Sequence, residues 1–133
     1  MAAQLQDDPG ISDDDELLRR VPAYHWIDCP GQRCRPSSLT FEDDPDGSLS
    51  VDIARLTTLA AVLSGHAGYA LIGFTARVAR ENGLIVVADP LPLNGAHAIV
   101  VGNKTGSRRR ALARLSVWVV APHDAGGLAP GTS

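Results

Sequence analysis

Three short, continuous apolar runs in the second half of the chain constrain its fold more than any other feature. They are YALIGF at residues 69–74, LIVVA at 84–88 and HAIVV at 97–101. Runs of this length, rich in β-branched residues, are typical of buried strands. Between the first two, Thr75 can cap a helix that Gly83 ends. That helix has only about two turns, which is short for a parallel crossover, so we expect a mixed sheet with these strands at its centre.

Two other segments have the apolar spacing of helices. Residues 53–63 place leucines at helical intervals, and Asp52 is the expected N-cap. Ser107 is expected to cap a helix that continues as far as Val119. A chain of 133 residues has the length of one domain. The sequence therefore predicts a single small α+β domain, in which a mixed β-sheet packs against two to three helices.

The two ends of the chain differ from its middle in composition. The first fifteen residues hold five aspartates and few large apolar groups, so we expect residues 1–15 to form a disordered acidic tail. Residues 122–133 are rich in Gly and Pro and are expected to form a flexible tail. The folded domain is then expected to span residues 16–121.

Charge and composition exclude several classes of protein. The net charge of −3 argues against a nucleic-acid binder that relies on neutralising phosphates. No apolar run approaches the length needed to cross a bilayer, so no membrane partner is expected. Only two cysteines are present, and the N-terminus lacks the features of a secretory signal, which favours the cytoplasm. Of the twelve basic residues only Lys104 is a lysine, a bias that suggests a bacterial genome of high GC content.

A basic cluster at the start of the last predicted helix is a candidate site for an anion or a partner. Lys104, Ser107, Arg108, Arg109 and Arg110 lie together in the sequence NKTGSRRR. Free N–H groups at a helix start attract anions, and arginine adds bidentate contacts. The spacing does not match a P-loop, and a solvated helix end with three exposed arginines is the alternative interpretation.

His25, Cys29 and Cys34 form a second cluster that has ligands suited to zinc. His66 or His97 would have to supply a fourth ligand. Structural zinc sites usually contain paired Cys-x2–4-Cys motifs, and this chain has only one irregular half, so we expect no metal. The favoured interpretation of the two cysteines is structural, as a thiol in a loop and a small residue that fills the core.

The order of several short motifs resembles a family of small uncharacterised bacterial proteins. The motifs are Arg19-Arg20-Val21, Arg35-Pro36-Ser37-Ser38 followed by Phe41, Leu49-Ser50-Val51, Asp89-Pro90, and His97-Ala98 followed by Gly102. This resemblance implies that residues 17–121 form one compact domain, and it implies no activity. A fainter likeness is to ADP-ribosyltransferase folds, and it implies that Arg20 and Ser37-Ser38 contact NAD. The catalytic glutamate motif of those enzymes is absent.

These observations lead to two functional hypotheses. Because no complete catalytic constellation is visible, the first is a non-catalytic interaction or regulatory module whose partner is another protein. The alternative is a nucleotide- or NAD-binding enzyme resembling an ADP-ribosyltransferase. It predicts that Arg20, Ser38 and His97 converge on one pocket. The sequence specifies no cofactor for either hypothesis.

Overall fold

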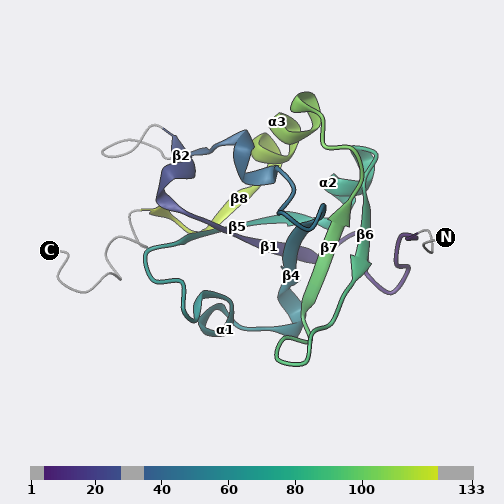
Figure 1. Cartoon of the computed structure of the whole chain (residues 1–133), viewed down its shortest axis with the longest axis horizontal. Helices are drawn as coiled ribbons and strands as arrows, with labels where there is room; N and C mark the ends of the chain where they lie inside the picture. The colour runs from purple at the N-terminus through teal and green to yellow at the C-terminus, as the bar shows by residue number, and fades with distance from the viewer. Residues whose placement is uncertain (1–4, 28–34, 123–133) are drawn as a thin grey trace, which may run out of the picture.

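The computed structural model describes residues 5–27 and 35–122, and it confirms a single small α+β domain (Figure 1). The main sheet has six strands in the order β6-β7-β4-β1-β5-β8. Their bounds are β1 Glu16–Val21, β4 Leu49–Ile53, β5 Ala70–Thr75, β6 Ile85–Ala88, β7 His97–Val101 and β8 Val117–Val120. The strands β2 (Trp26–Ile27) and β3 (Arg35–Pro36) form a separate small sheet. The helices are α1 Leu59–Leu63, α2 Ala76–Glu81 and α3 Gly106–Leu115, with 3-10 turns η1 Ala23–His25, η2 Ser38–Phe41 and η3 Ala54–Leu56.

Every strand pair within the described residues is antiparallel, whereas a mixed arrangement was expected. Strands β5 and β6 flank α2 and point the same way, but β1, β4 and β7 lie between them. After β5 and the short helix α2, the chain therefore enters the sheet again at its far edge, as β6. It does not form a parallel strand next to β5. The expectation that LIVVA lies at the centre is wrong, because β6 is an edge strand and β1 takes a central position.

The two faces of the sheet are covered by different elements, as Figure 1 shows. On one face α2, α3 and η2 pack over the larger core, which includes Phe41, Ala79 and Leu112. On the other face α1 covers a smaller core of Val62, Leu18 and Leu71 with partly buried neighbours. None of the helices in the described ranges has the length and apolar character that a membrane crossing requires.

Both ends of α2 are determined by the residues that flank it, Thr75 and Gly83. Thr75 accepts a hydrogen bond from the backbone N–H of Val78 at 3.3 Å, as an N-cap should. At the other end Gly83 has a φ of 79°, and its N–H donates to the carbonyl of Arg80 at 3.0 Å. The N–H of Leu84 reaches the carbonyl of Ala79 at 3.0 Å, which completes a Schellman motif. The predicted cap and stop of this helix are confirmed.

Two other helix predictions need correction. Residues 53–63 divide between the end of β4, η3 and the short helix α1, so Asp52 lies in a strand and Thr58 is the N-cap. The last helix is capped by Thr105 instead of Ser107, and it ends at Leu115. Residues 117–120 then form an outer strand, because Val117 and its neighbours are β-branched or aromatic and pair with β5.

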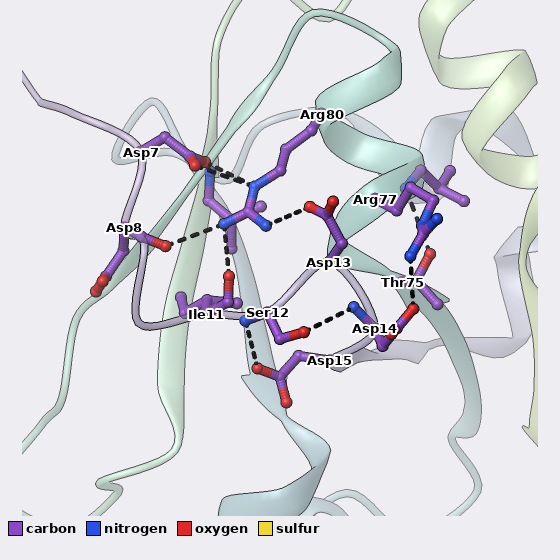
Figure 2. Close-up of polar contacts among 12 residues, drawn as sticks. Asp7, Asp8, Ile11, Ser12, Asp13, Asp14, Asp15, Thr75, Arg77 and Arg80 are labelled. Atoms are coloured by element: carbon purple, nitrogen blue, oxygen red, sulfur yellow. Dashed lines mark hydrogen bonds and ion pairs between the residues drawn. The ribbon is translucent and has the colours of Figure 1, made fainter.

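The acidic segment 5–15 is folded onto the domain, which corrects the expected disordered tail. Arg80 of α2 donates to the carboxylates of Asp7 and Asp13 and to the carbonyls of Asp8 and Ile11 (Figure 2). Ile11 is 2% exposed and belongs to the larger core. The aspartates do not repel the segment from the domain because arginines on α2 and η3 pair with them. Residues 1–4, and residues 123–133 of the C-terminal tail expected at 122–133, lie outside the described residues.

Candidate functional site

The candidate site lies where two central strands separate. Strands β1 and β4 pair at only two positions, Leu17 with Ile53 and Leu18 with Asp52. Beyond them, residues of both strands line a cleft of about 480 Å³, together with residues of η1, η2 and the loops that follow η2 and α1. Its volume lies within the range of ordinary small-molecule sites.

On one wall of this cleft, where β4 has no pairing with β1, side chains form hydrogen bonds with the backbone of Ser50 instead. The carbonyl of Ser50 in β4 accepts a hydrogen bond from Arg19 Nη1 at 2.9 Å. The backbone N–H of Ser50 donates to Asp44 Oδ2 at 3.0 Å. Arg19 and Asp44 also form a bidentate ion pair, with both N···O distances 3.1 Å. Burial alone would raise the pKa of Asp44, but the hydrogen bonds from Arg19 and Ser50 outweigh it and hold that pKa below its usual value. The pair therefore keeps the strands apart without leaving Ser50 unpaired.

Arg20, Asp52 and His97 lie on the opposite face of the sheet, on three adjacent strands. Asp52 is the register partner of both Leu18 and His97, and Arg20 is two residues beyond Leu18, so their side chains share one face. The Asp52 residue is 5% exposed, and its Oδ1 accepts a hydrogen bond from Asn94 Nδ2 at 2.7 Å. All three residues line the cleft.

The guanidinium of Arg20 is only partly engaged. Its Nη1 lies 3.6 Å from Asp52 Oδ2 and donates to the carbonyl of Val62 at 3.1 Å. Within the described part of the chain, its Nε and Nη2 donate to no protein group. Arg20 differs in this from Arg19, whose Nε also donates to the carbonyl of Thr40. Among the described cleft residues, Arg20 is therefore a cation with donors that remain free.

His97 is held by a carboxylate through one ring nitrogen. Its Nδ1 lies 3.1 Å from Asp89 Oδ2 and 3.0 Å from the carbonyl oxygen of Asp89. Both partners are acceptors, so we assign the proton of the neutral ring to Nδ1, which leaves Nε2 as an acceptor. This is the tautomer that a general base requires.

Two pairs of rings complete the cleft. Tyr24 contacts His25 edge to face with ring centroids 4.6 Å apart, and His66 contacts Tyr69 in the same way at 5.2 Å. All four rings line the cleft, and Tyr24 is 82% exposed. Exposed rings beside a cleft offer flat apolar surfaces to a planar ligand.

The structure brings together two of the three predicted catalytic candidates. Arg20 and His97 share the cleft, whereas Ser38 lines a separate groove of about 560 Å³ together with Arg110, Arg114 and Trp118. The sequence did not indicate Asp52 as a site residue, although a lone aspartate within the strand LSVDI is a signal. It also missed Asp89, Tyr24 and Tyr69 as site residues, although Tyr24 is next to His25 and Tyr69 is three residues from His66 in the sequence.

The predicted basic site at the start of α3 does not form one pocket. Lys104 is buried, with Nζ 2.5 Å from Asp43 Oδ1. The guanidinium of Arg109 folds back to the carbonyl of Lys104 at 2.5 Å, and Arg108 Nη1 donates to the carbonyl of Asn103 at 2.8 Å. Ser107 is exposed. These contacts account for most of the cluster, and its role in binding an anion stays a prediction.

The predicted metal candidates are only partly described. His25 lines the cleft, while Cys29 and Cys34 lie outside the described residues. Within residues 5–27 and 35–122, no three His, Cys, Asp or Glu side chains gather as a metal site would require.

Comparison of the chain with family models, curated protein sequences and solved structures finds no significant match. The resemblances noted in the sequence therefore stay predictions.

Proposed function

We propose that the protein binds a small nucleotide in the cleft between β1 and β4. The observation that carries this proposal is that a partly engaged arginine, Arg20, and two ring pairs line the same cavity. Arginine is suited to phosphate through bidentate hydrogen bonds, and aromatic rings are suited to stacking with a base.

The acidic residues of the cleft leave room for such a ligand because most of them are neutralised. Three carboxylates have a cation within 4 Å, in the pairs Asp43–Lys104, Asp44–Arg19 and Asp52–Arg20. The Asp52 carboxylate also accepts a hydrogen bond from Asn94. A phosphate that binds Arg20 therefore lies near aspartates that are already paired with cations.

His97 gives the cleft a group that can exchange a proton with the ligand. Asp89 holds its Nδ1, so its Nε2 is the candidate proton acceptor. This supports the nucleotide-binding enzyme over a purely passive binding module. Ser38 has no part in this version of the hypothesis, since it lies in the other groove.

Calorimetric titration with AMP, adenosine, inorganic phosphate and NAD tests the proposal. We expect AMP to bind the wild-type protein, and Arg20→Gln to weaken AMP by about tenfold, because hydrogen bonds to charged groups are worth about 1.5–3 kcal/mol. Adenosine should bind both proteins alike. Arg77→Gln is the control, since Arg77 pairs with Asp14 on the surface of α2 and lies outside the cleft. Absence of binding by all four probes at millimolar concentration would refute the proposal.

A protein-interaction module is the second candidate, and one observation favours it. The separate groove has a mostly apolar lining that includes Trp118 and Ala113, and Arg110 and Arg114 also line it. That combination fits an acidic peptide that carries apolar side chains. Reversing both charges with Arg110→Glu and Arg114→Glu should abolish binding of such a peptide in fluorescence anisotropy. Unchanged binding of an acidic peptide with apolar residues would count against this candidate.

A further inference from the structure

Within residues 5–27 and 35–122, two polar atoms in the residues that line the cleft have no hydrogen-bond partner. They are Oγ1 of Thr40 and Nδ1 of His25, both buried. Thr40 is 1% exposed, and it ranks among the largest fully buried side chains of the domain. Buried polar atoms in folded proteins almost always have partners, because an unpaired one loses its hydrogen bonds to water without replacement. Two such atoms beside one cavity indicate that a partner from outside the chain belongs there.

The backbone holds these two residues in place. The carbonyl of His25, at the end of η1, accepts a hydrogen bond from the N–H of Ser37 at 2.8 Å. The N–H of Thr40 in turn donates to the carbonyl of Ser37 at 3.0 Å, and Arg19 Nε donates to the carbonyl of Thr40 at 3.1 Å. The unpartnered atoms are therefore fixed by η1, η2 and β1 instead of lying on a loose loop. We call the part of the cleft lined by His25 and Thr40 the corner. A ligand would find the corner already formed.

Among the described residues of the corner, no cation is free for a ligand, and the nearby carboxylate of Glu42 acts on His25. Burial and the neighbouring positive charge of Arg19 lower the pKa of His25, so its ring is neutral at pH 7. Arg19 itself is committed to Asp44, to Ser50 and to the carbonyl of Thr40. A phosphate finds its cation at Arg20 instead. The two unpartnered atoms there are a hydroxyl oxygen and an imidazole nitrogen, which suit an uncharged group, and the Glu42 carboxylate nearby disfavours an anion.

We propose that His25 and Thr40 form a subsite that hydrogen-bonds an uncharged hydroxyl or amide group of the ligand. This inference rests on the proposed nucleotide function and assigns a second end to the cleft. Arg20 contacts the phosphate, and the His25–Thr40 subsite contacts the sugar or the base. The subsite would distinguish a nucleotide from free phosphate.

The variant Thr40→Val tests the subsite because it removes the hydroxyl and keeps the shape of the side chain. We expect its melting temperature to be equal to or above that of the wild type, since an unpaired buried hydroxyl is lost. We expect its affinity for AMP and adenosine to fall by about fivefold to tenfold, the effect of one hydrogen bond. Its affinity for inorganic phosphate should not change. The matched control is Thr57→Val, because Thr57 lies outside the cleft and its hydroxyl has no hydrogen bond within the described residues.

The outcomes separate the subsite from the proposed function. If AMP binds and responds to Arg20→Gln but binds Thr40→Val as tightly as wild type, the subsite is refuted and nucleotide binding stands. A lower melting temperature in Thr40→Val also refutes the subsite, because the hydroxyl then has a partner in the free protein. If no probe binds the wild type, nucleotide binding fails and the subsite fails with it. His25→Gln should reproduce the loss of adenosine affinity.

Discussion

Arg19 and Arg20 are neighbours in the chain and lie on opposite faces of the sheet. Successive residues of a strand alternate between its faces, so Arg19 points toward the larger core and Arg20 toward the other face. The Arg19 side chain is 15% exposed and fully engaged, whereas that of Arg20 is 34% exposed and partly engaged. The first holds the cleft in shape, and the second is the one that we propose for ligand binding.

Because the two arginines have different roles, replacing each with glutamine should lower the free energy of unfolding by different amounts. Arg19→Gln leaves Asp44 without its cation and the carbonyl of Ser50 without its donor, so we expect a loss of about 3 kcal/mol in the free energy of unfolding. Arg20→Gln should cost less than about 1 kcal/mol. Urea denaturation followed by tryptophan fluorescence measures both. Equal losses in the two variants would contradict the assignment of Arg19 to structure and Arg20 to binding.

Acid should weaken the fold through Asp15 and Asp44. Burial raises the pKa of each, but hydrogen bonds, from Arg55 to Asp15 and from Arg19 to Asp44, bring both below the ordinary 3.8. A carboxyl with a lowered pKa in the folded state contributes stability that is present above pH 3.8 and is lost as the pH falls through the folded-state pKa. We expect the urea midpoint to decrease as the pH falls below about 4.

The variant Asp44→Asn checks the origin of this acid sensitivity. It should be less stable than wild type at pH 7, because the ion pair with Arg19 is lost. Its urea midpoint should then change less between pH 5 and pH 3 than that of wild type. A parallel decrease in the two proteins would show that Asp44 does not contribute to the pH dependence.

At the scale of elements, the end of α2 depends on one glycine. Gly83 has a φ of 79°, and a Cβ added there would lie 2.7 Å from Arg108 Nη2. Gly83→Ala should therefore destabilise the domain by about 1–2 kcal/mol, the cost of a left-handed conformation with a side chain. Gly95→Ala is the control, because a Cβ there meets nothing within 4 Å and its φ is not positive. Thermal unfolding that gives equal losses for both variants would contradict this account of the helix end.

The elements that the sequence predicts well are those whose signals are local. Strands β5, β6 and β7 and the cap of α2 follow from apolar runs and from Thr75 and Gly83. The central position of β1 could not be predicted, because it depends on pairing with β4 and β5, which lie far along the chain. The split of residues 53–63 was also missed, since leucines at helical spacing fit both one long helix and the observed shorter pieces.

The same limit applies to the candidate site. Arg20 was indicated by the likeness to ADP-ribosyltransferase folds and His97 by its place at the start of a strand. Their partners Asp52 and Asp89 are chosen by strand register. The unpartnered atoms of His25 and Thr40 have no counterpart in sequence, because burial is a property of the folded chain. Residue types can thus indicate single candidate site residues, but only the fold shows which of them are in contact.

At the scale of the whole molecule, Arg80 joins the N-terminal segment to the domain (Figure 2). Arg80→Gln removes its two ion pairs, with Asp7 and Asp13, so we expect faster amide hydrogen exchange in residues 5–15 and at Val86. Arg77→Gln should have little effect, because the Arg77 and Asp14 side chains are 51% and 83% exposed. Exchange measured by mass spectrometry that is equal in both variants would rule out Arg80 as the anchor.

The contact of this segment with β6 also bears on how the molecule behaves at high concentration. An outer strand with unpaired N–H and C=O groups is a template on which another chain can add. At Val86 the N–H donates to Asp7 Oδ1 at 2.8 Å and the carbonyl accepts from the N–H of Asp8 at 2.9 Å, so both groups are already occupied. A shortened chain that starts at β1 would uncover them, and such a chain should elute as larger species in gel filtration while the full chain does not.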